Sequence, residues 1–181
     1  MIDHLESNRI VLKEMREKDW IDVHKYASQP IVCQYQPWGP NTEINSKEFV
    51  KEVIEDANLA PRSRYVFAVF AKENNQMIGS GEFNLRDLSN KVGEIAYIIH
   101  PDFWGKGIAT EVAKLLVEFG FEAFHLHRIY ATCDPRNSGS IKVLEKTGMT
   151  LEGRMRENLL IKDGWRDSLL YSILKQEFSI R

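Results

Sequence analysis

The sequence predicts an α/β fold in which one mixed, mostly antiparallel sheet is covered by helices. Three observations carry this prediction. Short apolar runs in the middle of the chain are typical of strands, amphipathic segments of helical period lie on either side of them, and the longest such segment is enclosed by two strand-like runs. A strand, a long helix and another strand in succession form a crossover, which sets its two strands parallel.

Helix signals dominate the first third of the chain. Residues 9–12 are typical of a short first strand. Asp19 is expected to cap a helix that ends before Gln29-Pro30, and Ser46 is expected to cap a second helix that ends near Pro61. We therefore expect two helices to precede the main run of strands, with a loop between them.

The centre of the chain predicts the core of the sheet. Residues 65–71, 77–85 and 93–100 are typical of three strands in an antiparallel meander. Residues 107–124 then carry apolar side chains on one stripe and charged ones on the other, which predicts the longest helix. A strand at 128–133 follows and completes the crossover.

The last part of the chain predicts one more helix and a closing hairpin. A short helix from Ser138 to Thr147 is expected to stop at Gly148, and two strands are expected around Asp163-Gly164. With 181 residues, 43% of them hydrophobic, the chain is long enough for one substantial core and short for two. We expect a single domain over residues 1–181.

Composition excludes several functional classes. A net charge of -2 provides no general basic field for nucleic acid or an anionic membrane, and no segment approaches the ~18 apolar residues of a membrane span. Cys33 and Cys133 stand alone, which suits a reducing cytoplasm, and the close pair His125 and His127 favours a structural role over metal binding. We expect a cytoplasmic protein without a metal, as a monomer or a homodimer.

The segment most suggestive of chemistry runs from residue 97 to residue 111, where a strand, a glycine-bearing loop and the start of the long helix follow one another. The first turn of a helix has amide N–H groups without partners, and the helix dipole adds positive charge there. Gly105 and Gly107 remove side chains from the approach, and Lys106 adds a cation. This pattern favours a binding site for an anion such as a diphosphate.

Two other phosphate-binding motifs do not match this loop. A Walker A loop needs glycine at position 100 and serine or threonine at 107, where the chain has His100 and Gly107. A dinucleotide fingerprint would need its third glycine at Thr110 and an acidic residue roughly 20 positions later. A plain tight turn into a buried helix remains an alternative interpretation.

The stretch Trp104-Gly-Lys-Gly-Ile-Ala109 resembles the acyl-CoA-binding motif of the GNAT superfamily, Arg/Gln-x-x-Gly-x-Gly/Ala. Tryptophan in the first position departs from that motif. The form Phe/Tyr-Trp-Gly-x-Gly-x-Ala-Thr-Glu is typical of the RimJ/RimL-like branch, whose members acetylate protein N-termini and assorted small amines. Residues 5–12, 137–140, 146–149 and 164–171 also resemble that branch, so nearly the whole chain is covered.

The resemblance implies acetyl-CoA as the donor and a sheet that splays between the strands at 94–99 and 128–133, with pantetheine in the gap. It assigns cofactor contacts to Ile98, Ile99, Trp104, Gly105, Lys106, Gly107, Ile108, Ala109, Thr110, Asn137, Ser140 and Lys146. The backbone of Ile98 and Ile99 would pair with pantetheine as a strand does. Asn137 and Ser140 have the alternative role of capping a helix, and Lys146 that of a solvated surface residue.

Transfer to an amine requires a proton acceptor. Glu94 is the first candidate because histone-acetylating relatives in the superfamily carry their basic glutamate at this point of the sheet, and Glu82 on the adjacent strand is the second, acting through water. Glu94 has the alternative role of a cross-strand surface charge. Many members protonate the leaving thiolate with a tyrosine at the position of Leu144, so here we expect water to do so.

Acceptor recognition is expected from Tyr35, Trp38 and Phe83, and a place in the core is the alternative role for these aromatic side chains. A carboxylate base suits an α-amine, with a pKa of ~7.7–8.0, better than a lysine amine near ~10.4. We therefore expect a peptide N-terminus, of the kind found on ribosomal proteins, as the acceptor. A small amine such as a polyamine, an antibiotic or an amino-acid-like toxin, and a non-catalytic acyl-CoA-binding module, are the alternatives.

Overall fold

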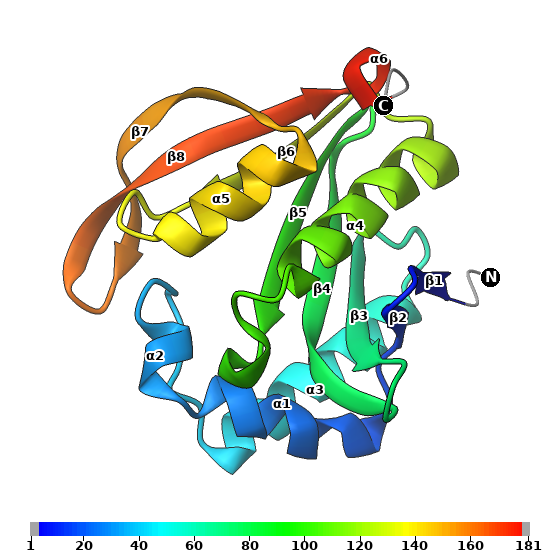
Figure 1. Cartoon of the computed structure of the whole chain (residues 1–181), viewed down its shortest axis with the longest axis vertical. Helices are drawn as coiled ribbons and strands as arrows, with labels where there is room; N and C mark the ends of the chain where they lie inside the picture. Colours follow the sequence, from blue (N-terminus) through cyan, green and yellow to red (C-terminus); the bar gives the residue numbers. More distant parts are fainter. Residues whose placement is uncertain (1–3, 179–181) are drawn as a thin grey trace.

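A computed structural model describes residues 4–178 and contains one eight-stranded sheet (Figure 1). The strands are β1 (Leu5–Glu6), β2 (Ile10–Glu14), β3 (Arg64–Ala71), β4 (Gln76–Asp87), β5 (Val92–Ile99), β6 (Arg128–Cys133), β7 (Thr150–Ile161) and β8 (Gly164–Leu174). Their order across the sheet is β1-β2-β3-β4-β5-β6-β8-β7, and β5 and β6 are the parallel pair in this order. The predicted mixed, mostly antiparallel sheet is confirmed.

Helices cover both faces of the sheet, as predicted. They are α1 (Trp20–Ala27), α2 (Pro30–Cys33), α3 (Glu43–Ala57), α4 (Ile108–Phe124), α5 (Ser138–Thr147) and α6 (Lys175–Phe178), with short 3-10 turns at Glu17–Asp19 and Pro101–Phe103. One buried cluster joins α4 to the sheet through Phe67, Phe83 and Leu116. A second cluster, around Val23 and Val50, joins α1 and α3 to the opposite face.

One predicted helix cap is wrong, and another lies at the predicted residue without a side-chain capping bond. Helix α3 begins one turn earlier than expected because Thr42 accepts a hydrogen bond from the backbone of Asn45 while the Asn45 side chain accepts from that of Thr42. Ser46 is consequently inside the helix, where its hydroxyl lies 3.2 Å from Nδ1 of His24. Asp19 is the N-cap residue of α1, as predicted, but its carboxylate accepts from the Arg16 backbone and makes no capping bond to α1.

The sheet forks between its two parallel strands. Residues Val92–Glu94 of β5 pair with Arg128–Tyr130 of β6, and beyond them the two strands separate. Each strand remains paired along its other edge, β5 with β4 and β6 with β8. The fork is therefore an opening inside an otherwise continuous sheet, and its position is the one that the resemblance implied.

Candidate active site

The part of β5 beyond the fork presents one backbone edge to the opening. The N–H of His100 donates to the carbonyl of Ile78 on β4 at 2.8 Å. Backbone groups alternate between the two edges of a strand, so Ile98 also turns toward β4, whereas Tyr97 and Ile99 turn toward the opening. The backbone of Ile98 therefore does not face the opening, which corrects the expectation that it pairs with pantetheine. The backbone of Ile99 does face the opening, where pantetheine was expected.

Trp104 closes the far end of this exposed edge. Its indole N–H donates to the carbonyl of Ile99 at 2.7 Å, although 46% of the residue remains exposed. The carbonyl of Ile99 thus has a partner within the chain. Its N–H is the group that stays directed into the opening.

The loop before α4 has the geometry of an anion site. Gly105 and Gly107 adopt left-handed backbone conformations, with φ of 72° and 80°, which side chains rarely adopt. Gly107 is the N-cap of α4 and brings no side chain to the amides of the first turn, those of Ile108, Ala109 and Thr110. A Cβ added at Gly105 would meet nothing within 4 Å, so a ligand can approach there.

The start of α5 forms the other side of the opening. Asn137 caps this helix, because its side-chain oxygen accepts from the N–H of Ser140 at 3.0 Å, and both residues line a cavity. The hydroxyl of Ser140 lies 3.0 Å from that of Tyr97, which reaches across from β5. Lys146 is exposed near the end of α5 and does not line this cavity.

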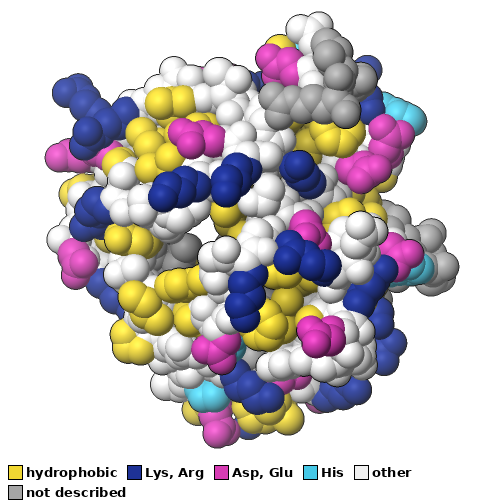
Figure 2. Space-filling model, viewed as in Figure 1, with side chains coloured by type: hydrophobic (Ala, Val, Ile, Leu, Met, Phe, Trp, Pro, Cys, Tyr) yellow, Lys and Arg dark blue, Asp and Glu magenta, His cyan; other side chains and the backbone are white. Residues whose placement is uncertain are grey.

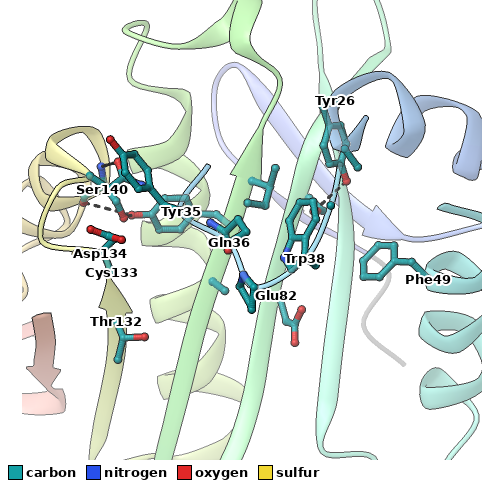
Figure 3. A pocket seen from close by; sticks show the side chains of 18 of the residues that line it. Tyr26, Tyr35, Gln36, Trp38, Phe49, Glu82, Thr132, Cys133, Asp134 and Ser140 are labelled. Atoms are coloured by element: carbon teal, nitrogen blue, oxygen red, sulfur yellow. Dashed lines mark hydrogen bonds between the residues drawn. The ribbon is translucent and has the colours of Figure 1, made fainter. Parts of the chain in front are cut away.

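A cavity with a volume of about 760 Å³ lies in front of the fork (Figure 3). Its walls come from β4, β5, β6, β7, β8, α1, α3, α5 and the loop at residues 35–41. Glu82 and Glu94 line it together with Tyr35 and Trp38, so residues far apart in sequence meet here as expected. Figure 3 shows Tyr35 on the Ser140 side of the cavity and Trp38 nearer to Tyr26 and Phe49.

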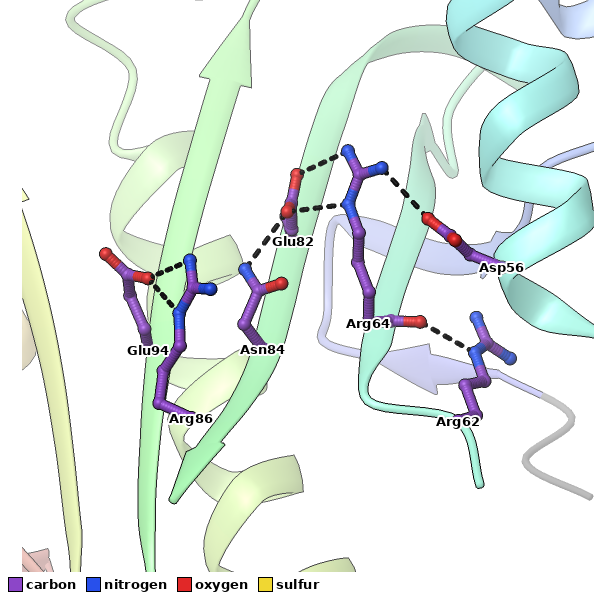
Figure 4. A network of polar contacts seen from close by, with 7 residues as sticks. All are labelled: Asp56, Arg62, Arg64, Glu82, Asn84, Arg86 and Glu94. Carbon is purple, nitrogen blue, oxygen red and sulfur yellow. Dashed lines mark hydrogen bonds and ion pairs between the residues drawn. The ribbon is translucent and has the colours of Figure 1, made fainter. Parts of the chain in front are cut away.

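Glu94 stands at the last residue pair before the fork, and 18% of its side chain is exposed. One carboxylate oxygen, Oε2, accepts from Nε and Nη2 of Arg86 at 2.6 and 2.5 Å (Figure 4). Among residues 4–178, no hydrogen-bond partner is recorded for the other oxygen, Oε1. Glu94 is therefore held in place through one oxygen, and the other has no recorded contact within the same residues.

Glu82 differs because both of its oxygens are engaged. Nε and Nη2 of Arg64 donate to them at 2.9 and 3.3 Å, and the amide of Asn84 donates at 3.0 Å. Arg64 also pairs with Asp56 of α3 at 3.0 Å (Figure 4). Glu82 lies opposite the exposed Ala96 of β5, so it borders the same surface as Glu94 without an unpaired oxygen.

Phe83 does not face the acceptor. It is fully buried on the opposite side of the sheet, where its ring lies 5.3 Å from that of Phe119 and 5.6 Å from that of Phe124, measured between centroids. The expectation of a substrate contact is wrong because side chains alternate along β4, so the neighbour of the cavity-lining Glu82 must point into the core.

A family model described as an acetyltransferase (GNAT) domain matches residues 9–150 of this sequence. The chain belongs to the GNAT acetyltransferase family. It is 32% identical over 97% of its length, and 99% of the relative's, to an uncharacterized N-acetyltransferase, YnaD, of Bacillus subtilis.

Two further matches have names that state an acceptor. The ribosomal-protein-S5-alanine acetyltransferase of Vibrio fischeri superposes with a TM-score of 0.80 at 24% identity, over 97% of this chain and 98% of that one. The spermidine N(1)-acetyltransferase of Escherichia coli is 23% identical over 95% of this chain and 89% of the relative. The likeness to the Vibrio fischeri enzyme shows that the two proteins share a fold.

Sequence reasoning missed Arg166, a residue of this GNAT site that comes from β8. Its Nη1 donates to the carbonyl of Tyr35 at 2.5 Å, and its Nη2 to the hydroxyl of Ser168 at 3.2 Å. Its Nε is buried without a recorded partner in the described part of the chain, and burial lowers the pKa of the guanidinium. No sequence signal links Arg166 to a loop 131 positions away.

Cys133 lines the cavity at the end of β6, and burial raises the pKa of its thiol to about 11. The thiol is therefore protonated near neutral pH and is a poor nucleophile.

Within residues 4–178, no helix is long and apolar enough to cross a bilayer. The same residues contain no group of three or more His, Cys, Asp or Glu side chains that could hold a metal ion.

Proposed function

We propose that this acetyltransferase moves an acetyl group from acetyl-CoA to a primary amine, with Glu94 accepting the proton of the amine. The observation that carries the proposal is the placement of Glu94 at the fork of the sheet. There it lines the cavity, is held by Arg86 through one oxygen, and keeps its other oxygen free.

The opening and the loop before α4 fit the donor. The N–H of Ile99 is directed into the opening, and the bare amides of Ile108 to Thr110 together with Lys106 suit a diphosphate. Acetyl-CoA supplies the acetyl group as a reactive thioester. The N–H of Ile99 can donate a hydrogen bond to an oxygen held beside it, which stabilises negative charge there.

The base has to work on an amine that is largely protonated near neutral pH, since an α-amine has a pKa of ~7.7–8.0 and other primary amines lie higher. The free Oε1 of Glu94 accepts that proton, while Arg86 keeps the carboxylate oriented. Glu82 contributes less directly, because Arg64 and Asn84 occupy its oxygens, and it acts on a water molecule between the two strands.

The departing thiolate takes its proton from water. Leu144 lines the cavity where many family members have a tyrosine, and it supplies no proton. A thiol with a pKa of ~8.5 is a fair leaving group near neutrality, so the reaction does not require a dedicated acid.

Replacement of Glu94 tests the proposal. Glu94→Gln should lower kcat about 100-fold, the order expected for loss of a general base, and calorimetry should show an unchanged Kd for coenzyme A. Glu55→Gln is the matched control, because Glu55 is exposed on α3 and does not line the cavity. Equal kcat values for Glu94→Gln and the control would assign the base to another residue.

For the acceptor we propose a peptide N-terminus, as the likeness to the RimJ/RimL-like branch suggests. The cavity is bordered by the loop at 35–41, which Arg166 holds by its hydrogen bond to Tyr35. The buried Nε of Arg166 supports a peptide as well, because an acceptor that carries carbonyl groups would satisfy it.

A polyamine is the second candidate, and one observation favours it. Glu48 and Glu52 lie one turn apart on α3, both line the cavity, and no ion pair is recorded for either within the described residues. A panel of peptides and polyamines in a thiol-release assay separates the two. Activity on peptides alone supports the first acceptor, and activity on polyamines alone overturns it.

A further inference from the structure

The turn between β1 and β2 contacts the first turn of α4, although the two segments are about a hundred residues apart. The hydroxyl of Ser7 donates to Oε2 of Glu111 at 2.7 Å, and Nε of Arg9 donates to Oε1 at 2.6 Å. Nη2 of Arg9 also contacts Oε1. Arg9 is thereby held at the N-terminal end of α4, where the diphosphate is expected.

The guanidinium of Arg9 lies beside the N-cap of α4. A Cβ built on Gly107 would lie 3.4 Å from Nη2 of Arg9, and no other heavy atom is recorded within 4 Å of that position among those compared. Gly107 thus keeps the space between the cation and the helix terminus open. About half of the Arg9 side chain, 51%, is exposed, so a ligand from solvent can reach it.

Arg9 also has donors to spare. The guanidinium carries five N–H groups. Those of Nε and Nη2 face Glu111, whereas Nη1 has no partner recorded in the described part of the chain. Figure 2 shows Lys and Arg side chains on the face that carries α4 and α5, including the region around the start of α4.

We propose that Arg9 binds the diphosphate of the cofactor, together with Lys106 and the amides of the first turn of α4. The inference rests on the proposed use of acetyl-CoA. Nη1 of Arg9 donates to a phosphate oxygen, while Glu111 and Ser7 keep the side chain extended toward Gly107. A planar guanidinium held in this way loses little freedom when it binds a phosphate.

The alternative is that the pair of Arg9 and Glu111 only ties β2 to α4, and the two residues give different results when replaced. Loss of a phosphate contact by Arg9→Gln should raise the Kd for coenzyme A about tenfold, as for a hydrogen bond between charged groups. Glu111→Gln removes a negative charge near the phosphates but keeps a side-chain oxygen that accepts from Arg9, so the Kd should change less than about threefold.

The experiment is calorimetry with coenzyme A and with dephospho-coenzyme A, which lacks the 3′-phosphate and keeps the diphosphate. Arg9→Gln should weaken both ligands by the same factor, and the loss should shrink at high salt. Arg128→Gln is the matched control. Arg128 pairs with Glu152 and follows the far end of α4, about 25 Å from its start at 1.5 Å per residue.

Three outcomes would overturn the proposal. An unchanged Kd for Arg9→Gln removes the contact, and an equal loss in Arg9→Gln and Glu111→Gln shows that the pair is a structural tie. A loss seen with coenzyme A and absent with dephospho-coenzyme A places Arg9 at the 3′-phosphate instead. Thermal unfolding of each variant excludes misfolding, and failure of the unmodified protein to bind coenzyme A would sink the proposed function itself.

Discussion

The donor side and the acceptor side of the candidate site differ in the groups that form them. On the donor side, residues 104–110 are consecutive, and they offer backbone amides and two glycines in left-handed conformations. On the acceptor side, Glu82 and Glu94 present carboxylates held by Arg64 and Arg86, and a loop held by Arg166 completes the wall. One side depends on local chain geometry, and the other on contacts between distant segments.

This difference explains why the donor can be inferred from sequence and the acceptor cannot. A loop of seven residues carries its own geometry, so its sequence resembles that of any chain that binds the same diphosphate. The cavity depends on which side chains the register of the sheet brings together, and the sequence of the loop does not specify them.

The largest expected effect is a loss of stability, and it tests whether Phe83 belongs to the core or to the acceptor side of the site. Phe83→Ala should lower the free energy of unfolding by about 3–5 kcal/mol, as for other buried aromatic rings, because Phe83 packs against Phe119 and Phe124. Denaturant titration measures this loss, and Phe178→Ala, at a half-buried position, should cost less. If Phe83→Ala raised the KM for the acceptor without lowering stability, Phe83 would have to contact the acceptor in the cavity.

The next effect tests the donor side. Gly107→Asp should raise the Kd for coenzyme A about 30-fold, corresponding to ~2 kcal/mol of repulsion between the carboxylate and the phosphates. Gly164→Asp is the control, because Gly164 also has a positive φ, of 114°, at the start of β8. Similar Kd values for both variants in calorimetry would show that the start of α4 does not bind the diphosphate.

A smaller effect tests the wall of the cavity. Trp38→Ala should raise the acceptor KM roughly tenfold, as for loss of a buried aromatic contact, and leave the Kd for coenzyme A unchanged. Trp165→Ala, at an exposed position outside the cavity, serves as the control in steady-state kinetics. If Trp38→Ala weakened cofactor binding as well, the two sides of the site would not be separable.

The smallest effect is expected at Tyr97. Burial raises the pKa of this tyrosine, and its hydroxyl is bonded to Ser140, so it is a poor proton donor. Tyr97→Phe should therefore change kcat by less than about threefold, a fraction of the 10²–10⁴ that a general acid contributes. A loss of 100-fold, with a shifted pH profile, would make Tyr97 the acid that replaces the tyrosine missing at Leu144.

The order of strands and helices followed from periodicity and from caps that act locally, such as Gly148, whose φ of 95° ends α5 where predicted. The predictions failed where two nearby residues could fill the same structural role. Ser46 and Thr42 both resemble helix caps, and the reciprocal bond with Asn45 decides for Thr42. To place the side chain of Phe83 and the backbone groups of Ile98, one must know which way each residue of the strand faces. That depends on how the strand pairs in three dimensions.

The acceptor side could be predicted only as a set of residue types. Glu94 is a candidate because of the resemblance to superfamily relatives with a glutamate at this point of the sheet, whereas its pairing with Arg86 depends on the register of β4 and β5. The contacts of Arg166 with Tyr35 and of Arg9 with Glu111 join segments more than a hundred residues apart. A single sequence contains no signal for such pairs.

Single-turnover kinetics with enzyme saturated with acetyl-CoA, measured from pH 6 to pH 9, tests the role of Glu94 most directly because cofactor binding and product release no longer contribute. We expect the rate of acetyl transfer by Glu94→Gln to be about 100-fold below that of the unmodified enzyme near neutral pH. Superimposable rates for the two proteins across this pH range would contradict the account.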